Sequence, residues 1–170
     1  MIDEVGPAAL SLREVARRAG VSHAAPAHHF GDKAGLLTAL AVEGYGLLAD
    51  ELRSAYERTG DFLEVGVAYV RFAVSRRAHF DVMFRPELHR ADDPELVAAR
   101  AEASTVLYGP AARVSGRRTE RARDAGIAAW SLVHGFATLL LNGNLPPETR
   151  RRPEAAARRA ASHLFGGRGR

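Results

Sequence analysis

Apolar side chains recur every three or four residues along most of this chain, which is the spacing of one face of a helix. Ala, Leu, Arg and Glu fill these periodic segments, and most of them favour helices. The alternating β-branched runs that are typical of strands are missing. The pattern therefore predicts an all-α fold.

Glycines and capping residues divide the periodic segments into separate helices. Gly20 and Gly31 end the first two helices, Ser11 and Glu14 have the spacing of a capping box, and Asp32 can cap the long third helix. The predicted helices span residues 12–19, 22–30, 32–58, 61–77, 94–107, 119–142 and 153–165. Loops are predicted over 109–118 and 143–149.

The segment from Leu12 to Ser22 reads Leu-Arg-Glu-Val-Ala-Arg-Arg-Ala-Gly-Val-Ser and predicts two helices that cross at a tight turn. Ala16 is small enough for close crossing, Gly20 can adopt a left-handed turn, and Val21 is expected to fill the angle between the helices. Ser22 is placed to cap the second helix. The apolar face of the first helix is formed by Val15, Ala16 and Ala19. This is the arrangement of a helix-turn-helix, whose second helix enters the major groove, although any tight helical hairpin gives the same short pattern.

The next residues, His-Ala-Ala-Pro-Ala-His-His-Phe-Gly-Asp-Lys-Ala-Gly-Leu-Leu over 23–37, resemble the DNA-binding domain of the TetR family of transcriptional regulators. That domain ends in a His-Phe pair, followed by a Lys that opens a long fourth helix, and the match runs from Leu10 to about Ala41. Further along, Ala-Trp-Ser-Leu-Val-His-Gly over 129–135 resembles the signature of the WHG-type C-terminal domain in one TetR subclass. The resemblance implies a helix-turn-helix domain over 1–41 and a helical ligand-binding and dimerisation domain over 42–170.

The expected recognition helix offers His and Ala side chains to DNA. Imidazole nitrogens can hydrogen-bond to base edges, and Ala methyl groups can contact thymine methyl groups. The start of this helix suits a phosphate, as does the Lys at the start of the long helix. We therefore expect contacts with a pseudo-palindromic operator in double-stranded DNA from Ser11, Ser22, His23, Ala24, Ala27, His28 and Lys33. The resemblance places His29 inward beside Phe30.

Three features depart from the family pattern. Residues 1–5 cover at most the last turn of the usual first helix, and neither Ala27 nor His28 supplies the Tyr that often stands near the His-Phe pair. Pro26 lies about four residues into the predicted recognition helix, where the subclass also has a Pro. The short start has two interpretations. Either translation begins further upstream, or the protein is a dimeric small-molecule-binding protein of TetR descent with weak or no DNA binding.

The C-terminal half is expected to bind a second copy and a small-molecule effector. In TetR-like proteins the last two helices of each subunit form a four-helix dimer interface, and here the candidates are Ile127, Trp130, Phe136, Leu140, Ala157, Ala161 and Leu164. Trp130 and His134 share one helix face because they are four residues apart. The candidate ligand-binding residues are Phe72, Phe80, Met83, Phe84, His89, Trp130 and His134, with core packing as the alternative for each.

Charge does not mark a DNA-binding face in this chain of 170 residues, although its formal net charge is +4. Residues 1–56 carry five basic and seven acidic side chains, whereas 111–170 carry twelve basic and four acidic ones. There is no cysteine, which excludes disulfides, thiolate metal sites and cysteine nucleophiles and fits a cytoplasmic location. Neither a nucleophile elbow nor a phosphate loop occurs, so we expect no enzymatic activity and no cofactor.

Two further patterns in the sequence are weak signals. His79, Asp81, His89 and Asp92 match no recognised metal signature, so no metal is expected. The uncharged segment 125–141 is at the short limit for a membrane span, and a buried helix is the favoured interpretation. The sequence thus predicts a homodimeric repressor that a small molecule releases from its operator.

Overall fold

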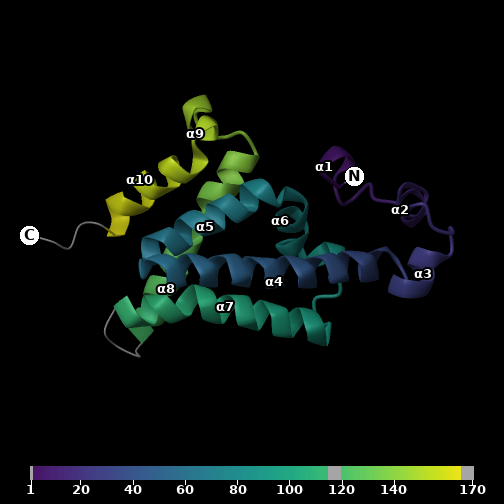
Figure 1. Cartoon of the computed structure of the whole chain (residues 1–170), viewed down its shortest axis with the longest axis horizontal. Helices are drawn as coiled ribbons and strands as arrows, with labels where there is room; N and C mark the ends of the chain where they lie inside the picture. Colours follow the sequence, from purple (N-terminus) through teal and green to yellow (C-terminus); the bar gives the residue numbers. More distant parts are fainter. Residues whose placement is uncertain (1, 115–119, 166–170) are drawn as a thin grey trace, which may run out of the picture. The chain divides into compact units, whose positions relative to one another are not determined.

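The computed structural model describes the backbone of residues 2–114 and 120–165, with their side chains except at 3, 5, 109–114, 120–122, 164 and 165. These segments form helices and turns without any strand, which confirms the predicted all-α fold. The elements, shown in Figure 1, are α1 (Ile2–Val5), α2 (Leu12–Ala19), α3 (Ala25–Phe30), α4 (Lys33–Thr59), α5 (Phe62–Ser75), α6 (Arg77–Met83), η1 (Pro86–Leu88), α7 (Pro94–Val114), α8 (Glu120–Leu141), α9 (Pro147–Arg151) and α10 (Pro153–Phe165).

The chain divides into two compact units. Unit 1 comprises Met1–Gly46 and Arg76–Ala101, and unit 2 comprises Leu47–Ser75 and Glu102–Arg170. Unit 1 therefore holds α1, α2, α3, α6 and η1, whereas unit 2 holds α5, α8, α9 and α10. The long helices α4 and α7 contribute residues to both units.

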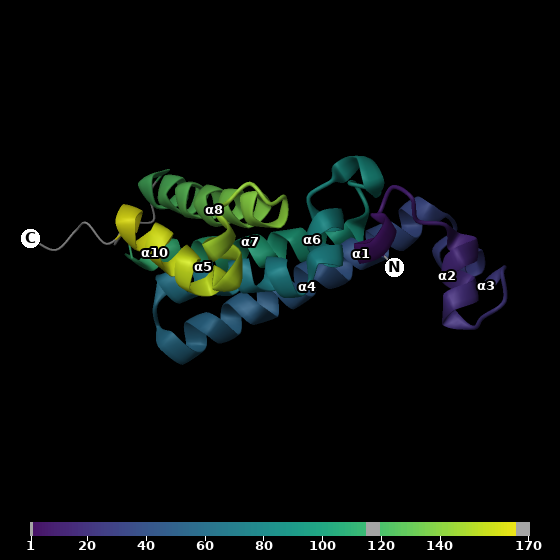
Figure 2. The same cartoon turned by 90° about the horizontal axis from the view of Figure 1, so that it is seen from above.

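The N-terminal part of unit 1 is a helix-turn-helix. The first helix, α2, has the predicted bounds, and Gly20 ends it in the left-handed conformation with a φ of 69°. α2 packs on α3, and Figure 2 shows the two short helices side by side just before α4. Ala16 is fully buried and Pro26 is also buried, so both contribute to the packing. The predicted crossing at Ala16 and the turn at Gly20 are confirmed.

The expected recognition helix, α3, begins at Ala25, so the prediction that Ser22 caps it is wrong. The Ser22 carbonyl accepts a hydrogen bond of 3.0 Å from the Ala25 N–H, which closes a turn ahead of the helix, and Ala24 takes the N-cap position. Pro26 therefore lies in the first turn of α3 and not four residues into it. A first-turn N–H has no partner within the helix, so the proline costs no hydrogen bond there.

The capping box predicted at the start of α2 does not form. Ser11 is the N-cap with extended backbone, but its side chain makes no capping hydrogen bond. The Glu14 carboxylate accepts instead from Arg17 at 2.7 and 2.6 Å and from Arg18 at 3.0 Å. Hydrogen bonds to two guanidinium groups are stronger than a reach back to one neutral amide, so the ion pairs prevail.

Three predicted inward positions are also wrong. Val21, expected to fill the angle between α2 and α3, is 48% exposed. Ala19 and His29 are exposed as well, and His29 meets Phe30 edge-to-face at 4.6 Å on the outside of the unit. Because α3 has only six residues, Pro26 and the half-buried Phe30 cover the interior without them.

The rest of unit 1 has a core between α4, α6 and the start of α7. The predicted helix 61–77 ends at Ser75, and after a break at Arg76 the chain forms α6 and η1, which were not predicted separately. Buried apolar side chains from these elements are Leu37, Ala41, Tyr45, Phe80, Val82, Met83 and Leu96. α6 carries Phe80 and Met83, two candidate ligand-binding residues, into this core.

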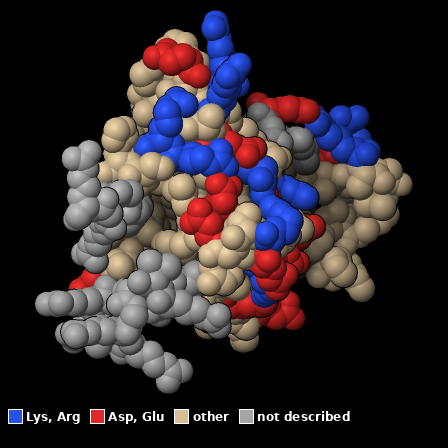
Figure 3. Space-filling view, turned by 60° about the vertical axis from the view of Figure 1, so that its left-hand side comes forward, with Lys and Arg blue, Asp and Glu red and all other residues tan. Residues whose placement is uncertain are grey.

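Unit 2 is built around α5, which packs against both α8 and α10. Half of the residues of α5 are buried, namely Val65, Val67, Ala68, Tyr69, Val70, Phe72 and Ala73. The Arg158 guanidinium on α10 donates to both Glu64 carboxylate oxygens on α5, at 2.8 and 2.7 Å. Arg71 likewise pairs with Glu51 at 2.6 Å. Figure 3 shows basic and acidic side chains next to one another over the described part of the face that it presents.

Two predicted loops are partly helical. α7 continues through residues 109–114, and α9 begins at Pro147 inside the expected loop 143–149. Gly109 and Pro110 favour a break locally, but Ala103 and Leu107 are buried within the two turns before Gly109, and the helix that presents them continues. Tertiary packing outweighs local preference here.

Candidate DNA-binding surface and ligand-binding residues

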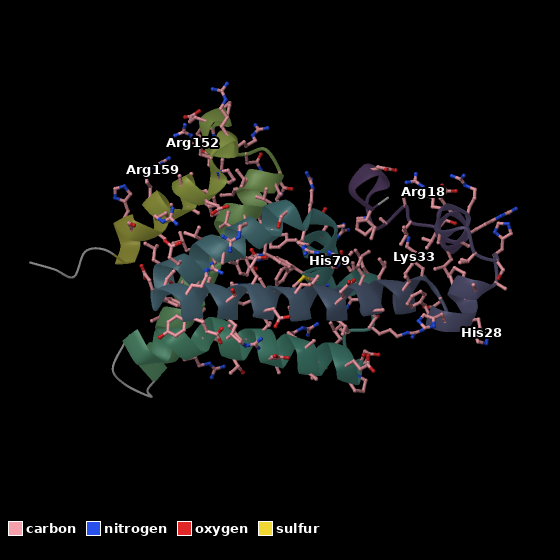
Figure 4. All side chains as sticks on the ribbon, in the orientation of Figure 1. Arg18, His28, Lys33, His79, Arg152 and Arg159 are labelled. Carbon is pink, nitrogen blue, oxygen red and sulfur yellow. The ribbon has the colours of Figure 1, made fainter. Side chains whose placement is uncertain are left out.

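The expected base-contacting side chains all lie on the outside of unit 1. His23, Ala24, Ala27 and His28 are all exposed, on α3 and on the turn before it. Figure 4 shows His28 at the end of the unit, with its ring pointing away from the helices. Ser11 and Ser22 are exposed as well. The structure thus brings six of the seven candidates to the surface formed by α2, α3 and the turn between them.

Lys33, the seventh candidate, is half-buried at the start of α4. Its ammonium group donates a hydrogen bond to the Ala8 carbonyl, which ties the segment before α2 to α4. An ammonium group has three donors, so two remain for a phosphate oxygen. Lys33 can therefore hold the segment before α2 against α4 and contact a DNA phosphate at the same time.

The two arginines at the end of α2 are held by acids. Arg18 pairs with Glu4 on α1 at 2.7 Å and with Glu14 at 3.0 Å, and Arg17 pairs with Glu14. Hydrogen bonds from both guanidinium groups lower the pKa of Glu14 to about 2. The carboxylates offset part of the positive charge of α2, so the surface is only weakly basic.

Arg90 fixes the junction between α3 and α4, a role that the sequence analysis missed. Its backbone N–H donates to the Thr38 hydroxyl at 3.0 Å, and its guanidinium donates to Asp32 at 3.1 Å. Asp32 in turn caps α4, because its other carboxylate oxygen accepts from the Gly35 N–H at 2.8 Å. That amide, with the nearby Arg90 charge, lowers the pKa of Asp32. Arg90 and Asp32 are 58 residues apart, so no local pattern reveals the contact.

Four of the candidate ligand-binding residues lie in unit 1. The Phe80 and Phe84 rings are 5.1 Å apart, and Phe84 meets Tyr45 at 5.9 Å. Met83 is buried, and its carbonyl accepts a hydrogen bond of 3.0 Å from the Tyr45 hydroxyl. His89 is buried after η1. Tyr45 and Arg100, whose guanidinium carbon lies 5.7 Å from the Tyr45 ring centroid, complete this group and were not predicted.

The other three candidates, Phe72, Trp130 and His134, lie in unit 2. Phe72 is fully buried on α5. Trp130 and His134 share one face of α8, as predicted, and both reach the buried hydroxyl of Tyr69, at 3.3 Å from the indole N–H and 2.8 Å from Nδ1. Burial lowers the pKa of His134, so its neutral ring can accept the Tyr69 proton. Tyr69 is the residue that sequence reasoning missed, since it stands 65 positions before its partner.

The candidate interface residues differ in how far they are already covered. Ile127 is 43% exposed, and Trp130 and Phe136 are half-buried. Leu140, Ala157 and Ala161 are buried within this chain, whereas the side chain of Leu164 lies outside the described residues. The part of α8 from Arg123 to Leu141 is long and apolar enough to cross a membrane by length and composition, yet only 28% of it is buried. Leu139, also exposed, adds to this apolar surface.

The residues weighed as a metal site have other partners or lie apart. His79 contacts Glu43 at 3.2 Å, and Asp81 pairs with Arg77 at 3.6 Å. Within the described side chains, no three His, Cys, Asp or Glu gather as a metal site requires.

Comparison with known proteins assigns both halves of the chain. The family model described as "Bacterial regulatory proteins, tetR family" matches residues 1–40, and the model described as "Tetracyclin repressor-like, C-terminal domain" matches residues 62–164. The chain matches none of the curated proteins with which it was compared.

Two solved structures share the fold. A protein of unknown function from Rhodococcus sp. RHA1 is 32% identical, with a TM-score of 0.78 over 96% of this chain and 87% of that one. The TetR family transcriptional regulator PfmR from Thermus thermophilus is 22% identical, with a TM-score of 0.69 over 99% of this chain and 94% of that one. The C-terminal model alone covers more than half of the sequence. With its N-terminal helix-turn-helix and its tetracycline-repressor-like C-terminal part, the chain belongs to the TetR family of transcriptional regulators.

Proposed function

We propose that this TetR-family protein is a homodimeric repressor that binds a pseudo-palindromic operator and leaves it when a small-molecule effector binds. The helix-turn-helix of residues 1–41 would contact DNA, and residues 42–170 would bind the effector and the second subunit. We assign the latter part to the WHG subclass on the motif of Trp130, His134 and Gly135. The protein would act in the cytoplasm, without a cofactor or catalysis of its own.

The observation that carries the proposal is the exposed α3. Its outward side chains are small or carry imidazole, and the segment around it is held by Lys33 and by Arg90. A short helix fixed at both ends can enter a major groove without clashes from large side chains. Imidazole and methyl groups are suited to base edges, whereas Lys33 suits a phosphate.

The exposed apolar surface of α8 supports the second subunit. Ile127 and Leu139 are 43% and 45% exposed, whereas Leu140 is buried. Such a surface on a regulator of this family is best covered by the same surface of another copy, because a two-fold interface is self-complementary. A two-fold dimer also presents two recognition helices, which explains a pseudo-palindromic site.

The DNA-binding part is tested by selecting bound duplexes from a random library and measuring affinities for the selected site. His28→Ala should change the preferred base at one position per half-site, at a cost of about 1–3 kcal/mol for the original site. Lys33→Ala should weaken binding to all sequences and lower the salt slope by about one unit. His163→Ala, at an exposed position on α10, serves as the control. If a folded dimer selects no duplex, the alternative of a TetR-derived sensor without DNA binding is correct.

The dimer is tested by light scattering on variants of two exposed positions. Ile127→Glu should give a monomer, because a charge in a covered interface costs several kcal/mol. Val97→Glu is a matched control, since Val97 is 49% exposed on α7 and outside the proposed interface. A monomeric unmodified protein at micromolar concentration would exclude the proposed interface.

A further inference from the structure

His89 is a buried histidine without a hydrogen bond. It is 7% exposed, and within the described part of the chain neither ring nitrogen has a partner. The Met83 carbonyl lies near the ring but makes no hydrogen bond to it, and it already accepts from Tyr45. Leaving a buried polar group unpaired costs about 1–3 kcal/mol, so such groups are rare in folded proteins and call for an explanation.

The charges of Arg100 and of the Glu87 carboxylate both act on His89, and the Met83 carbonyl lies beside its ring. Burial lowers the pKa of His89, and the positive charge of Arg100 lowers it further, so the ring is neutral and offers one donor and one acceptor. Arg100 also approaches the Tyr45 ring, which meets Phe84. We call His89, Tyr45, Met83, Phe84 and Arg100 the His89 cluster.

This chemistry favours a small acid with an apolar body. A carboxylate can accept from the imidazole N–H and from a guanidinium, and hydrogen bonds to charged groups are about twice as strong as neutral ones. The rings of Tyr45 and Phe84 suit the apolar part of such a molecule. A neutral polar ligand lacks the negative charge that a guanidinium attracts.

Arg90, the residue after His89, fixes the start of α4 next to the candidate DNA-binding helix α3. The Arg90 N–H donates to the buried Thr38 hydroxyl, and its guanidinium donates to the Asp32 cap of α4. Arg90 also lies beside Gly35, whose added Cβ would be 3.2 Å from a guanidinium nitrogen. All these residues belong to unit 1, so a change in backbone position at His89 is passed on directly to the junction of α3 and α4.

We infer that a small organic acid is the effector, that its carboxylate binds His89 and Arg100, and that Arg90 transmits its binding to α3. This inference rests on the proposed function and adds to it the class of ligand and the route of regulation. Binding satisfies the unpaired imidazole, moves the segment of residues 88–91, and withdraws Arg90 from Asp32 and Thr38. The junction then loosens, and α3 no longer holds the position that DNA requires.

The ligand class is tested with benzoate, phenylacetate, cinnamate and octanoate, each compared with its neutral amide, by calorimetry on the full chain. At least one acid should bind tenfold or more tightly than its amide. His89→Leu should abolish that binding and at the same time raise the melting temperature, because it removes an unpaired polar group from the core. Unfolding of the variant is thus distinguished from loss of the site. Equal binding of acid and amide, or no binding of any acid, would overturn the ligand class.

The route is tested by the ratio of operator affinities with and without the binding acid. The unmodified dimer should lose at least tenfold in affinity when the acid is present. In Arg90→Ala the acid should bind as before, while the ratio falls to about one. Arg85→Ala is the matched control, because Arg85 lies four residues before His89, outside the segment of residues 88–91, and pairs with exposed Glu87 at 2.9 Å. An Arg90→Ala variant that still responds fully would refute the route.

These outcomes separate the inference from the function on which it rests. If no duplex is bound by the folded dimer, the proposed function fails. If the dimer binds DNA and is released by neutral compounds alone, the proposed function stands and the inference fails.

Discussion

Gly35 is the glycine whose replacement should affect the DNA-binding element most. It is buried in the first turn of α4, and a Cβ built on it would collide with the Phe30 carbonyl oxygen, at the end of α3. The Phe30 carbonyl carbon would be 3.1 Å away and an Arg90 nitrogen 3.2 Å away. A backbone carbonyl cannot rotate aside as a side chain can, so α3 must shift to accommodate even one methyl group.

The size of the effect follows from two opposing terms. Replacing Gly by Ala in a helix interior stabilises it by roughly 1 kcal/mol where there is room. Inserting a methyl group into a filled site costs about 1–3 kcal/mol or more. Gly46 on the same helix is the matched control, because nothing lies within 4 Å of its added Cβ. Gly46→Ala should therefore be neutral or slightly stabilising, and Gly35→Ala should be less stable than it by about 2 kcal/mol.

Urea denaturation followed by circular dichroism measures both variants. Because the collision lies at the end of the recognition helix, Gly35→Ala should also lose operator affinity under conditions in which it remains folded. Equal unfolding free energies for the two variants would show that α3 does not pack against α4 at Gly35, and the description of this junction would be wrong.

Three other predictions concern the buried polar groups. The free energy of unfolding should fall as the pH drops from about 7 towards 5. The pKa values of His89 and His134 are lowered in the folded chain, whereas a His in the unfolded chain has a pKa of about 6.5, so the unfolded chain binds protons more readily. A urea midpoint that stays constant over this range would contradict the prediction. Tyr69→Phe should cost about 1–3 kcal/mol, since it removes the partner of Trp130 and His134, whereas Tyr56→Phe at a half-exposed position should cost little. In a His134→Leu background the Tyr69→Phe cost should shrink, and an unchanged cost in this double-mutant cycle would show that the hydroxyl acts elsewhere. Glu64→Gln should lower the free energy of unfolding by about 1 kcal/mol, because it breaks the half-buried ion pair with Arg158. An equal loss in Glu57→Gln, at an exposed site, would show that the change in net charge, and not the ion pair, causes the loss.

The sequence was sufficient where a local signal defines the structure. Gly20, Gly31 and Asp32 mark the ends of helices through their own backbone or side-chain chemistry, and α2 and α10 have the predicted bounds. The family resemblance correctly identified the helix-turn-helix. The exposed positions of His23 and His28 follow from the same register.

The remaining features depend on contacts between distant residues. No periodicity shows that Arg90 meets Asp32 or that Tyr69 meets His134, since 58 and 65 residues separate them. The break at Arg76 that creates α6 lies within a segment whose apolar spacing continues past it. At Glu14 the local signal was ambiguous, because the same carboxylate could cap the helix or pair with Arg17. The ion pair with Arg17 forms because it is the stronger interaction.

Trp130 is the single tryptophan of this chain, and its position gives the protein a built-in optical reporter. Its indole lies 5.9 Å from the His134 ring and 6.4 Å from the Tyr108 ring, and its N–H is bound to the buried Tyr69 hydroxyl. Fluorescence excited at the tryptophan band therefore comes from one place in unit 2. Any event that protonates His134 or separates α8 from α5 changes the emission intensity and wavelength. Local unfolding of unit 2 can therefore be followed in real time without attaching a dye.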